Sequence, residues 1–379
     1  MEPPKTAVEL LQKLIQIPSV NPEGTPGFDR TGEKECAEYV GEFLKLCGAS
    51  VTYDEVLPDR PNVIGKFPCN SSAGFRFLFA PHTDTVSVLG MTVEPFGGEI
   101  RDGKVFGRGA SDTKGTMAGM LWALYEMRGE IADLNAEISF VGLMGEEAGQ
   151  PGSQHFAEKY SGQYDFALVG EPTELKTVYA HKGCSWIDLI TRGVAAHGAS
   201  PQLGDNAVRK MFPVLDTLLA EIEAKLPDFK DPHLGDPTLN LGKISGGHST
   251  NIVPDICRAS LDIRSTPPLQ EAGGAEKWVR DMLKAHCFDE YVDVEVMVDA
   301  VPLLTSPDHP GVQALMSIGS ELTTAPWFCD AGRLAGGNIP AVACGPGNIA
   351  QAHTKDEFLD LKKFEDGVEF YGNFLKTFR

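Results

Sequence analysis

The sequence lacks long hydrophobic runs and a recognisable export signal. No stretch approaches the roughly 18 consecutive apolar residues that a membrane-spanning helix needs. The first residues, "MEPPKTAVELLQKL", begin acidic and become amphipathic, unlike a signal peptide. We therefore expect a soluble protein that is neither exported nor embedded in a membrane.

Clusters of basic residues and closely spaced cysteine pairs are also missing. The net charge is −20, from 33 basic and 53 acidic residues, which argues against nucleic acid or an anionic membrane as a partner. The eight cysteines are scattered and form no C-x-x-C pair. Scattered cysteines are typical of reduced, buried thiols rather than of a disulfide framework or zinc finger, so we expect a cytoplasmic protein.

The early part of the chain alternates helix and strand. A chain of 379 residues, 42% of them hydrophobic, exceeds the usual size of a single core, so two domains are expected. Residues 6–17, 33–48 and 113–129 are predicted helices, and Gly48 is the expected C-cap of the second. Short apolar runs at 75–80, 136–144 and 165–170 are typical of strands covered on both faces. This βαβ pattern predicts an α/β sandwich with a largely parallel sheet.

From about residue 180 the pattern changes to one of a compact insert. Predicted strands at 184–193, 238–245, 255–265 and 291–300 alternate with helices at 205–226 and 274–286. The order β-α-β-β-α-β is that of a ferredoxin-like α+β domain. After Pro302 helices and short apolar runs return, so the compact domain is inserted into the larger one.

Charged side chains follow the predicted strands of the first part. In open α/β sheets the carboxyl ends of the strands form the ligand crevice. Imidazoles and carboxylates gathered there are ligand types for zinc, manganese or cobalt. The candidates are His82, Asp84, Asp112, Glu146, Glu147, Glu171 and His353.

Each candidate also has an ordinary explanation. His82 and Asp84 could form a surface turn, and Asp112 could cap the following helix. Glu146 and Glu147 could lie in a solvated turn, Glu171 could precede a plain Pro turn, and His353 could be a core histidine. Their joint occurrence at sheet edges favours a metal site.

Eight short blocks of the sequence carry a resemblance to a known family: "HTDTV", "GRGASDTKG", "GEEAG", "VGEPT", "AHGASP", "TLNLGKISGG", "NIVPDICRASLDIR" and "AQAHTKDEFL". In these blocks the sequence resembles the zinc aminoacylase and carboxypeptidase metallopeptidases, in the group of acetylornithine deacetylase and succinyl-diaminopimelate desuccinylase. The resemblance implies a three-layer zinc-exopeptidase-like catalytic domain with an inserted lid or dimerisation domain, and a homodimer formed through that insert. The domain boundaries would be 1–178 and 299–379 for the catalytic domain and 179–298 for the insert.

The resemblance implies a pair of zinc ions, which cobalt could replace. His82 and Glu171 would bind one ion, Glu147 and His353 the other, and Asp112 would bridge them. Asp84 would orient His82, and the peptide bond after Asp112 would be cis.

The same resemblance gives adjacent Glu146 and Glu147 separate roles. Glu147 would bind metal, while Glu146 would take a proton from the attacking water and pass it to the leaving amine.

The insert would contribute to the substrate site. His197 matches a histidine that stabilises the oxyanion, often across a dimer interface, and otherwise would be an ordinary loop histidine. Asn251 and Arg264 correspond to residues near the substrate carboxylate, which an arginine can bind with two parallel hydrogen bonds. For Arg264 the alternative is a salt bridge within the insert.

Within this family the sequence looks most like the acetylornithine deacetylases, which release ornithine and acetate from N2-acetylornithine in arginine biosynthesis. The "DAGR" segment with Asp330 and Arg333 instead resembles the desuccinylase and carboxypeptidase branches. Asp330 could meet a substrate ammonium or pair with Arg333. A desuccinylase or dipeptidase is the alternative enzyme, and an inactive scaffold protein is the alternative of another class. Six further histidines would be surface or structural: His155, His181, His233, His248, His286 and His309.

Overall fold

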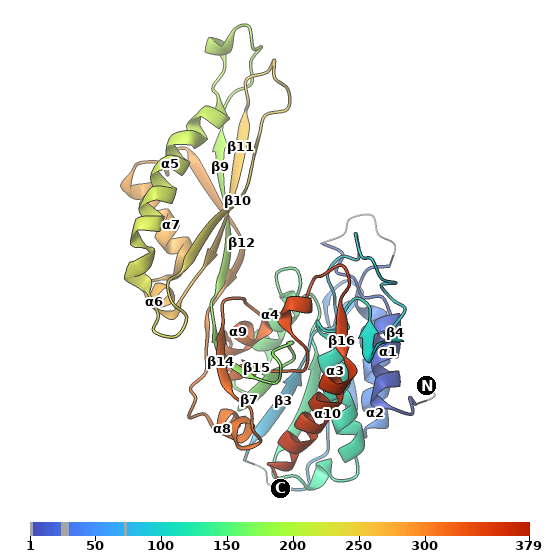
Figure 1. Cartoon of the computed structure of the whole chain (residues 1–379). Coiled ribbons are helices and arrows are strands. Elements are labelled where there is room, and N and C mark those ends of the chain that lie inside the picture. Colours follow the sequence, from blue (N-terminus) through green and yellow to red (C-terminus); the bar gives the residue numbers. More distant parts are fainter. Residues whose placement is uncertain (1–2, 24–29, 72–73) are drawn as a thin grey trace. The chain divides into compact units, whose positions relative to one another are not determined.

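The computed structural model describes residues 3–23, 30–71 and 74–379. These fold into two compact units (Figure 1). Unit 1 comprises Met1–Tyr179, Thr305–Thr323 and Cys329–Arg379, and unit 2 comprises Ala180–Leu304 and Thr324–Phe328. The sequence had assigned all of 299–379 to the catalytic domain, whereas residues 299–304 and 324–328 cluster with unit 2.

The main sheet has nine strands and a parallel centre. Strands β6 (Glu137–Gly142), β3 (Arg76–Ala80), β7 (Phe166–Val169) and β15 (Ala341–Ala343) are parallel neighbours. The prediction of a largely parallel sheet was wrong for its flanks, which are antiparallel where pairing is defined. The flanking strands are β1 (Ser50–Leu57) and β2 (Arg60–Lys66) beyond β6, and β8 (Thr177–His181), β13 (Leu303–Leu304) and β14 (Leu322–Ala325) beyond β15.

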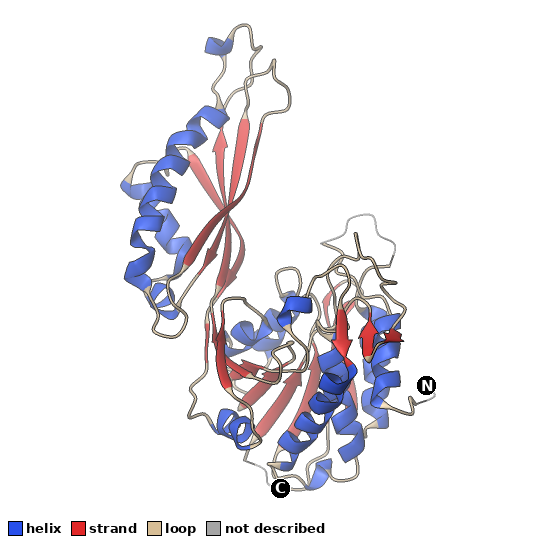
Figure 2. Ribbon diagram, viewed as in Figure 1, coloured by secondary structure: helices blue, strands red, loops and turns tan. Residues whose placement is uncertain are grey.

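Helices on both faces of the sheet complete three layers (Figure 2). On one face the aromatic rings of Phe77 and Phe79 in β3 contact Phe374 and Tyr371 of helix α10. The helices of this layer are α1 (Ala7–Gln16), α2 (Lys34–Leu46), α3 (Lys114–Met127) and α10 (Leu361–Lys376), and those of the other include α4 (Pro151–Lys159) and α9 (Asp330–Gly336). A shorter helix, α8, spans Pro310–Ser317.

Local signals in the sequence set the helix ends. The Thr6 side chain accepts a hydrogen bond from the Glu9 amide and so caps α1. Gly48 follows α2 with φ +93°, a left-handed conformation that glycine adopts without penalty. Both ends agree with the predicted helices.

A small sheet joins two distant segments of unit 1. Strands β4 (Glu99–Arg101), β5 (Lys104–Phe106) and β16 (Phe358–Asp360) pair in the order β16-β5-β4. Because β16 is antiparallel to β5, the residues that precede β16 lie beside those that follow β5. The segments around His353 and Asp112 are thereby brought together.

Unit 2 has the predicted ferredoxin-like order of elements. Its antiparallel sheet has the order β10-β11-β9-β12, with a buried core between the sheet and two helices (Figure 1). The strands are β9 (Cys184–Arg192), β10 (Thr238–Gly246), β11 (Ile256–Arg264) and β12 (Val292–Ala300), and the helices are α5 (Ala207–Lys225), α6 (Pro267–Glu271) and α7 (Gly274–Ala285).

The eight cysteines all lie in the described part of the chain, and no two of them form a disulfide. Six of them are buried, as expected for thiols that contribute to packing. Among the described residues, no helix combines the length and hydrophobicity required to cross a membrane.

Candidate active site

Three parallel strands deliver candidate residues to the same edge of the main sheet. β3 leads to His82, β6 leads to Glu146 and Glu147, and β7 leads to Glu171. Since β3 pairs in parallel with both β6 and β7, their carboxyl ends meet. A parallel bridge between His82 and Leu143 extends the β3–β6 pairing into the site.

His82, Asp112 and Glu147 form a cluster of potential metal ligands. One donor atom from each lies within 4.8 Å of the others. His82 Nε2 is 3.1 Å from Asp112 Oδ1. Both His82 and Asp112 are buried, which excludes an exposed turn as the explanation for His82.

His353 joins this cluster from the C-terminal part of unit 1. Its Nε2 lies 3.1 Å from Glu147 Oε2 and 3.4 Å from Asp112 Oδ2. The His353 side chain is 54% exposed, so it is not a core histidine. The two oxygens of Asp112 thus face two imidazoles, the arrangement expected of a bridging carboxylate.

Asp112 does not cap the following helix. The N-cap of α3 is Thr113, and its side chain makes no capping hydrogen bond. Instead Thr113 Oγ1 donates to the Gly170 carbonyl, 2.7 Å away, next to Glu171. The peptide bond between Asp112 and Thr113 is cis, as the resemblance implied.

Glu171 is buried at the end of β7. Burial raises the pKa of its carboxyl well above the ordinary value, and the negative charges of Asp112 and Glu146 raise it further. The Glu171 carboxyl therefore lies within electrostatic range of the Asp112 and Glu146 carboxylates. Its burial excludes a plain surface turn.

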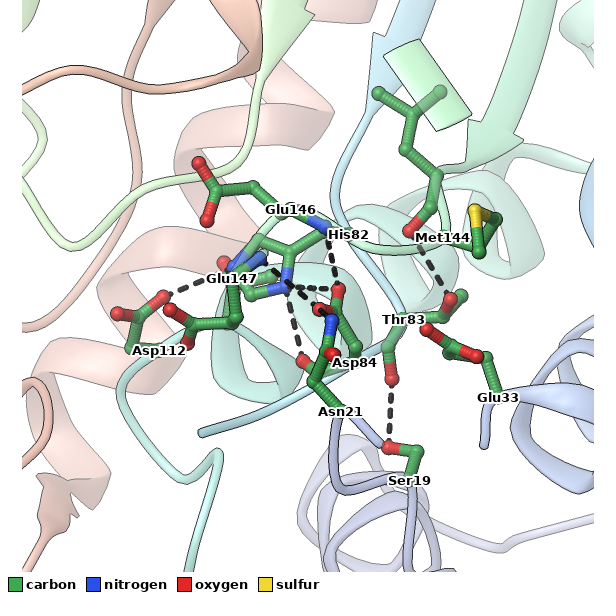
Figure 3. A network of polar contacts seen from close by, with 12 residues as sticks. Ser19, Asn21, Glu33, His82, Thr83, Asp84, Asp112, Met144, Glu146 and Glu147 are labelled. Carbon is green, nitrogen blue, oxygen red and sulfur yellow. Dashed lines mark hydrogen bonds and ion pairs between the residues drawn. The ribbon is translucent and has the colours of Figure 1, made fainter. Parts of the chain in front are cut away.

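Asp84 is buried at the centre of the polar network in Figure 3. Its Oδ1 accepts the Glu146 amide and its Oδ2 accepts the Glu147 amide, both at 3.0 Å. Asn21 Nδ2 donates to Oδ2 at 2.8 Å. A single carboxylate thus fixes the backbone that carries both glutamates, which excludes a loose solvated turn.

The His82 ring is oriented by the same segment. Its Nδ1 lies 3.0 Å from the Asp84 carbonyl oxygen and 3.4 Å from Asp84 Oδ1. A carbonyl oxygen only accepts, so Nδ1 carries a hydrogen and Nε2 is the nitrogen turned toward Asp112. With its Nδ1 hydrogen held by Asp84, the ring would offer Nε2 to a cation that replaces the Nε2 proton.

Glu146 lies beside the cluster with its own hydrogen-bond partner. Gln150 Nε2 donates to Glu146 Oε1 at 2.8 Å. Burial raises the pKa of Glu146 well above its ordinary value, and the charge of Asp330 adds to the effect.

The charges of the cluster are suited to a cation. Burial and the neighbouring Asp112 raise the pKa of Glu147. Hydrogen bonds with Asp112 and Glu147 raise the pKa of His353 to about 10. Burial alone would lower the pKa of His82, but hydrogen bonds with Asp112 and Asp84 raise it well above the ordinary value. Carboxylates this close attract positive charge, and the imidazole and carboxylate donors fit divalent zinc or cobalt.

Asp330 and Arg333 lie on helix α9. Asp330 is buried, and its Oδ1 accepts a hydrogen bond from Ser153 Oγ at 2.5 Å. Burial raises the pKa of Asp330 to about 7, and the positive charge of Arg333 acts in the opposite direction.

His197, Asn251 and Arg264 belong to unit 2. His197 and Asn251 are exposed on neighbouring loops joined by a bridge between His197 and Ile252. His197 Nδ1 accepts the Ala199 amide at 3.1 Å. Arg264 pairs with Asp262 within unit 2, with Nε 2.9 Å from Oδ1, which is the alternative that the sequence left open.

Three residues that support the site have no role among those predicted from the sequence. They are Asn21 beneath Asp84, Gln150 beside Glu146, and Glu357, whose carboxylate contacts the Asp112 segment. Glu357 lies within the block "AQAHTKDEFL", so its proximity to His353 was the available signal. His181 is buried against Trp327 and Phe328 in unit 2 and is structural.

Known proteins resemble this chain along almost its whole length. Residues 78–377 match the model of peptidase family M20/M25/M40. The acetylornithine deacetylase of Proteus mirabilis (strain HI4320) is 28% identical, with 98% of this chain and 97% of the relative covered. That of Vibrio atlanticus (strain LGP32) is 26% identical, with 98% of each chain covered.

Solved structures share the fold. An M20 family metallo-carboxypeptidase, Sso-CP2 from Sulfolobus solfataricus, aligns with a TM-score of 0.79 at 19% identity over 99% of both chains. Aminopeptidase PepT from Bacillus cereus ATCC 10987 aligns with a TM-score of 0.72 at 22% identity, covering 98% of this chain and 97% of that one. With a family match over most of its length and a cluster of metal-ligand side chains at the sheet edge, the chain belongs to peptidase family M20/M25/M40 and is a metal-dependent amide hydrolase.

Proposed function

We propose that this protein removes the acetyl group from N2-acetylornithine, giving ornithine and acetate, and so serves arginine biosynthesis in the cytoplasm. The observation that carries a hydrolytic role is the cluster of His82, Asp112 and Glu147, with Glu146 beside it. The preference for an acetylated substrate rests on the similarity to acetylornithine deacetylases at 26–28% identity.

Two zinc ions, or cobalt in their place, would occupy the cluster. His82 and Glu171 would hold one ion, Glu147 and His353 the other, and Asp112 would be shared. When bound, such ions polarise an amide carbonyl and lower the pKa of water. The donor types and the mutual repulsion of the buried carboxylates support this assignment.

Glu146 would act as the general base and acid. It takes a proton from the attacking water while the water oxygen bonds to the acyl carbon. It then returns the proton to the nitrogen as the carbon–nitrogen bond breaks, leaving a carboxylic acid and an amine, which become carboxylate and ammonium when the acid's proton passes to the amine. The hydrogen bond from Gln150 occupies Oε1 of Glu146, which leaves Oε2 to exchange the proton.

Asp84 would allow Glu146 to transfer protons and Glu147 to bind metal by fixing the backbone of both residues. It holds His82 through Nδ1 and holds the backbone of Glu146 and Glu147 through their amides. With the backbone fixed, the two side chains keep different directions, so that one can bind metal while the other transfers protons.

Unit 2 would supply residues that recognise the substrate. His197 would stabilise the oxyanion, and Asn251 and Arg264 would contact the substrate carboxylate. Arg264 would then exchange its partner Asp262 for the ligand, because a guanidinium binds either carboxylate in the same planar geometry.

A homodimer through unit 2 is part of the proposal. β10 is an edge strand that pairs with β11 alone among the described strands. Ile244 on β10 and Phe212 on α5 are exposed. An open strand edge with apolar side chains favours pairing with another chain, and a second copy supplies an identical edge.

One observation favours a second candidate function. Asp330 and Arg333 form the "DAGR" segment, which resembles the desuccinylase and carboxypeptidase branches. An arginine in this position would suit a substrate with a further carboxylate. A succinyl-diaminopimelate desuccinylase or a related dipeptidase is therefore the second candidate.

Turnover on matched substrates tests the proposal. Metal-loaded protein would be assayed with N2-acetylornithine, N-succinyl-diaminopimelate and dipeptides, and the largest kcat/KM is expected for N2-acetylornithine. Hydrolysis of only the succinylated substrate or the dipeptides would replace the first candidate by the second. Absence of any turnover, together with metal content near zero after zinc or cobalt loading, would instead indicate a scaffold protein.

A further inference from the structure

Glu357 has a fully buried carboxylate that collects four N–H donors. Its side chain is 0% exposed. Oε1 accepts the amides of Ser111 and Asp112 at 2.9 and 3.0 Å. Oε2 accepts the Gly109 amide at 3.1 Å and Arg108 Nη1 at 2.8 Å. Hydrogen bonds to a buried carboxylate are stronger than those between neutral groups, so four of them hold the loop in one conformation.

Most of these donors belong to the backbone of the Asp112 segment. Arg108 supplies only one of the four, and its Nε and Nη2 also donate to the Ser87 carbonyl at 3.2 and 2.9 Å. An ion pair alone would not require amides from three residues of one loop. The arrangement is that of an anion held by several backbone N–H groups of one loop, with a side chain of the protein as the anion.

Glu357 also lies four residues after His353. Its own carbonyl accepts the Gly107 amide at 3.1 Å, and the next residues form β16, which pairs with β5. One residue therefore links the segment that carries His353 to the segment that carries Asp112. The Lys355 carbonyl accepts the Thr92 amide at 2.7 Å, which anchors the middle of the His353 segment.

From this geometry we propose that Glu357 is a positioning residue for metal binding: its carboxylate fixes the Asp112 backbone relative to His353, and so sets where the shared Asp112 carboxylate lies. This role rests on the proposed metal binding by Asp112. Residues that support metal ligands in this way typically change metal affinity or activity roughly 10–100-fold when replaced.

The test is Glu357→Gln in the full-length protein. Glutamine keeps one oxygen for the Ser111 and Asp112 amides, but its NH₂ group would face the Gly109 amide and Arg108, two donors. Zinc affinity would be measured on metal-free protein by titration against a competing chelator, with cobalt as a second probe. We expect roughly 10–100-fold weaker binding, a lower kcat with little change in KM, and partial recovery of turnover at high zinc.

Asp165→Asn is the matched control. Asp165 likewise accepts a backbone amide and an arginine, from Arg76 N, Nε and Nη2 at 2.8, 3.0 and 2.6 Å. This carboxylate contacts none of the candidate ligands, so its loss should lower thermal stability without changing zinc affinity.

The possible outcomes distinguish a failure of the positioning role of Glu357 from a failure of the proposed function. If Glu357→Gln binds zinc as tightly as the unmodified protein and only its melting temperature falls, as in the control, the positioning role is overturned. If Glu357→Gln does not fold, Glu357→Asp carries the same test, because it retains the charge but withdraws the carboxylate by one methylene. If the unmodified protein itself binds no zinc or cobalt, the proposed function fails first.

Discussion

The candidate residues of unit 1 and unit 2 are held in different ways. In unit 1, Asp84 and Asp112 are buried, and backbone amides fix the segments around them. In unit 2, His197 and Asn251 are exposed and make short local contacts, such as the bond from Ser249 Oγ to Asn251 Oδ1 at 2.6 Å. Arg264 is partly buried and has an acidic partner of its own.

This difference matches what each group would have to do. A metal cluster and a proton carrier need positions fixed to a fraction of an ångström, and buried hydrogen bonds supply that precision. Residues that recognise a substrate must exchange water or an internal partner for the ligand, so exposure suits them. Substitutions in unit 1 should therefore affect metal and chemistry, and those in unit 2 should affect transition-state binding.

The largest expected effect comes from Glu146→Gln. Loss of the proton carrier should lower kcat by roughly 10²–10⁴-fold and leave zinc content nearly unchanged, because the cluster of His82, Asp112 and Glu147 is retained. Single-turnover kinetics and metal analysis of the same preparation test this. Loss of zinc together with activity would show that Glu146 is a ligand.

Glu147→Gln should instead weaken metal binding itself. The amide replaces the carboxylate whose Oε2 lies 3.1 Å from His353 Nε2. Replacing a residue that only supports a metal ligand typically weakens metal binding roughly 10–100-fold, and replacing a ligand itself should lower zinc affinity by at least that much. Chelator competition measures the change, and excess zinc should restore part of the turnover. Equal behaviour of the Glu146 and Glu147 variants would remove the distinction between their roles.

His197→Ala tests the contribution of unit 2. Loss of an oxyanion donor typically costs roughly 10²–10³-fold in kcat, while zinc affinity should stay at its unmodified value because the cluster belongs to unit 1. Steady-state kinetics and zinc titration separate the two quantities. A neighbouring exposed residue, Leu203, supplies the control variant Leu203→Ser, and a similar loss there would contradict a specific role for His197.

The smallest effect concerns the stability of unit 2. Burial lowers the pKa of His181 to about 4, from an ordinary value of 6.5. Between about pH 4 and pH 6.5, His181 is therefore protonated in the unfolded chain but neutral in the folded chain. The free energy of unfolding decreases as the pH falls from about 6.5 toward 4. At pH 5 the loss is about 2 kcal/mol.

His181→Asn should remove this pH dependence. The His181 Nδ1 faces the Lys182 carbonyl at 2.9 Å, and an asparagine amide can donate there without taking up a proton. Urea unfolding at pH 5 and pH 7 measures the difference in unfolding free energy. The same acid sensitivity in both proteins would assign it to other groups.

Much of the site could be predicted from the sequence because parallel strands impose a simple rule. Apolar runs before His82, Glu146 and Glu171 marked three strands, and parallel neighbours end at one edge. The β-α-β-β-α-β order of unit 2 could be predicted in the same way, because its strands and helices each have an ordinary length and a clear apolar pattern. These features depend on local pattern, which a sequence displays directly.

The remaining features depend on contacts between distant segments. β2 contains Arg60, Pro61 and Asn62, residues with weak strand preference, and its pairing with β1 and β6 forms the antiparallel flank. Glu357 and Asn21 acquire their roles only when the folded chain places them beside Asp112 and Asp84. A single carboxylate or amide residue is not part of a periodic pattern, so the sequence around it does not indicate which distant residue it will contact.

The two amides accepted by Asp84 have a consequence for engineering this enzyme. Since one side chain anchors successive peptide groups, Glu146 and Glu147 cannot be adjusted separately by altering their common support. Efforts to broaden the range of accepted acyl groups should leave that anchor intact and vary instead the solvent-facing loops around His197 and Asn251, which are proposed to recognise the substrate and where the side chains make short local contacts.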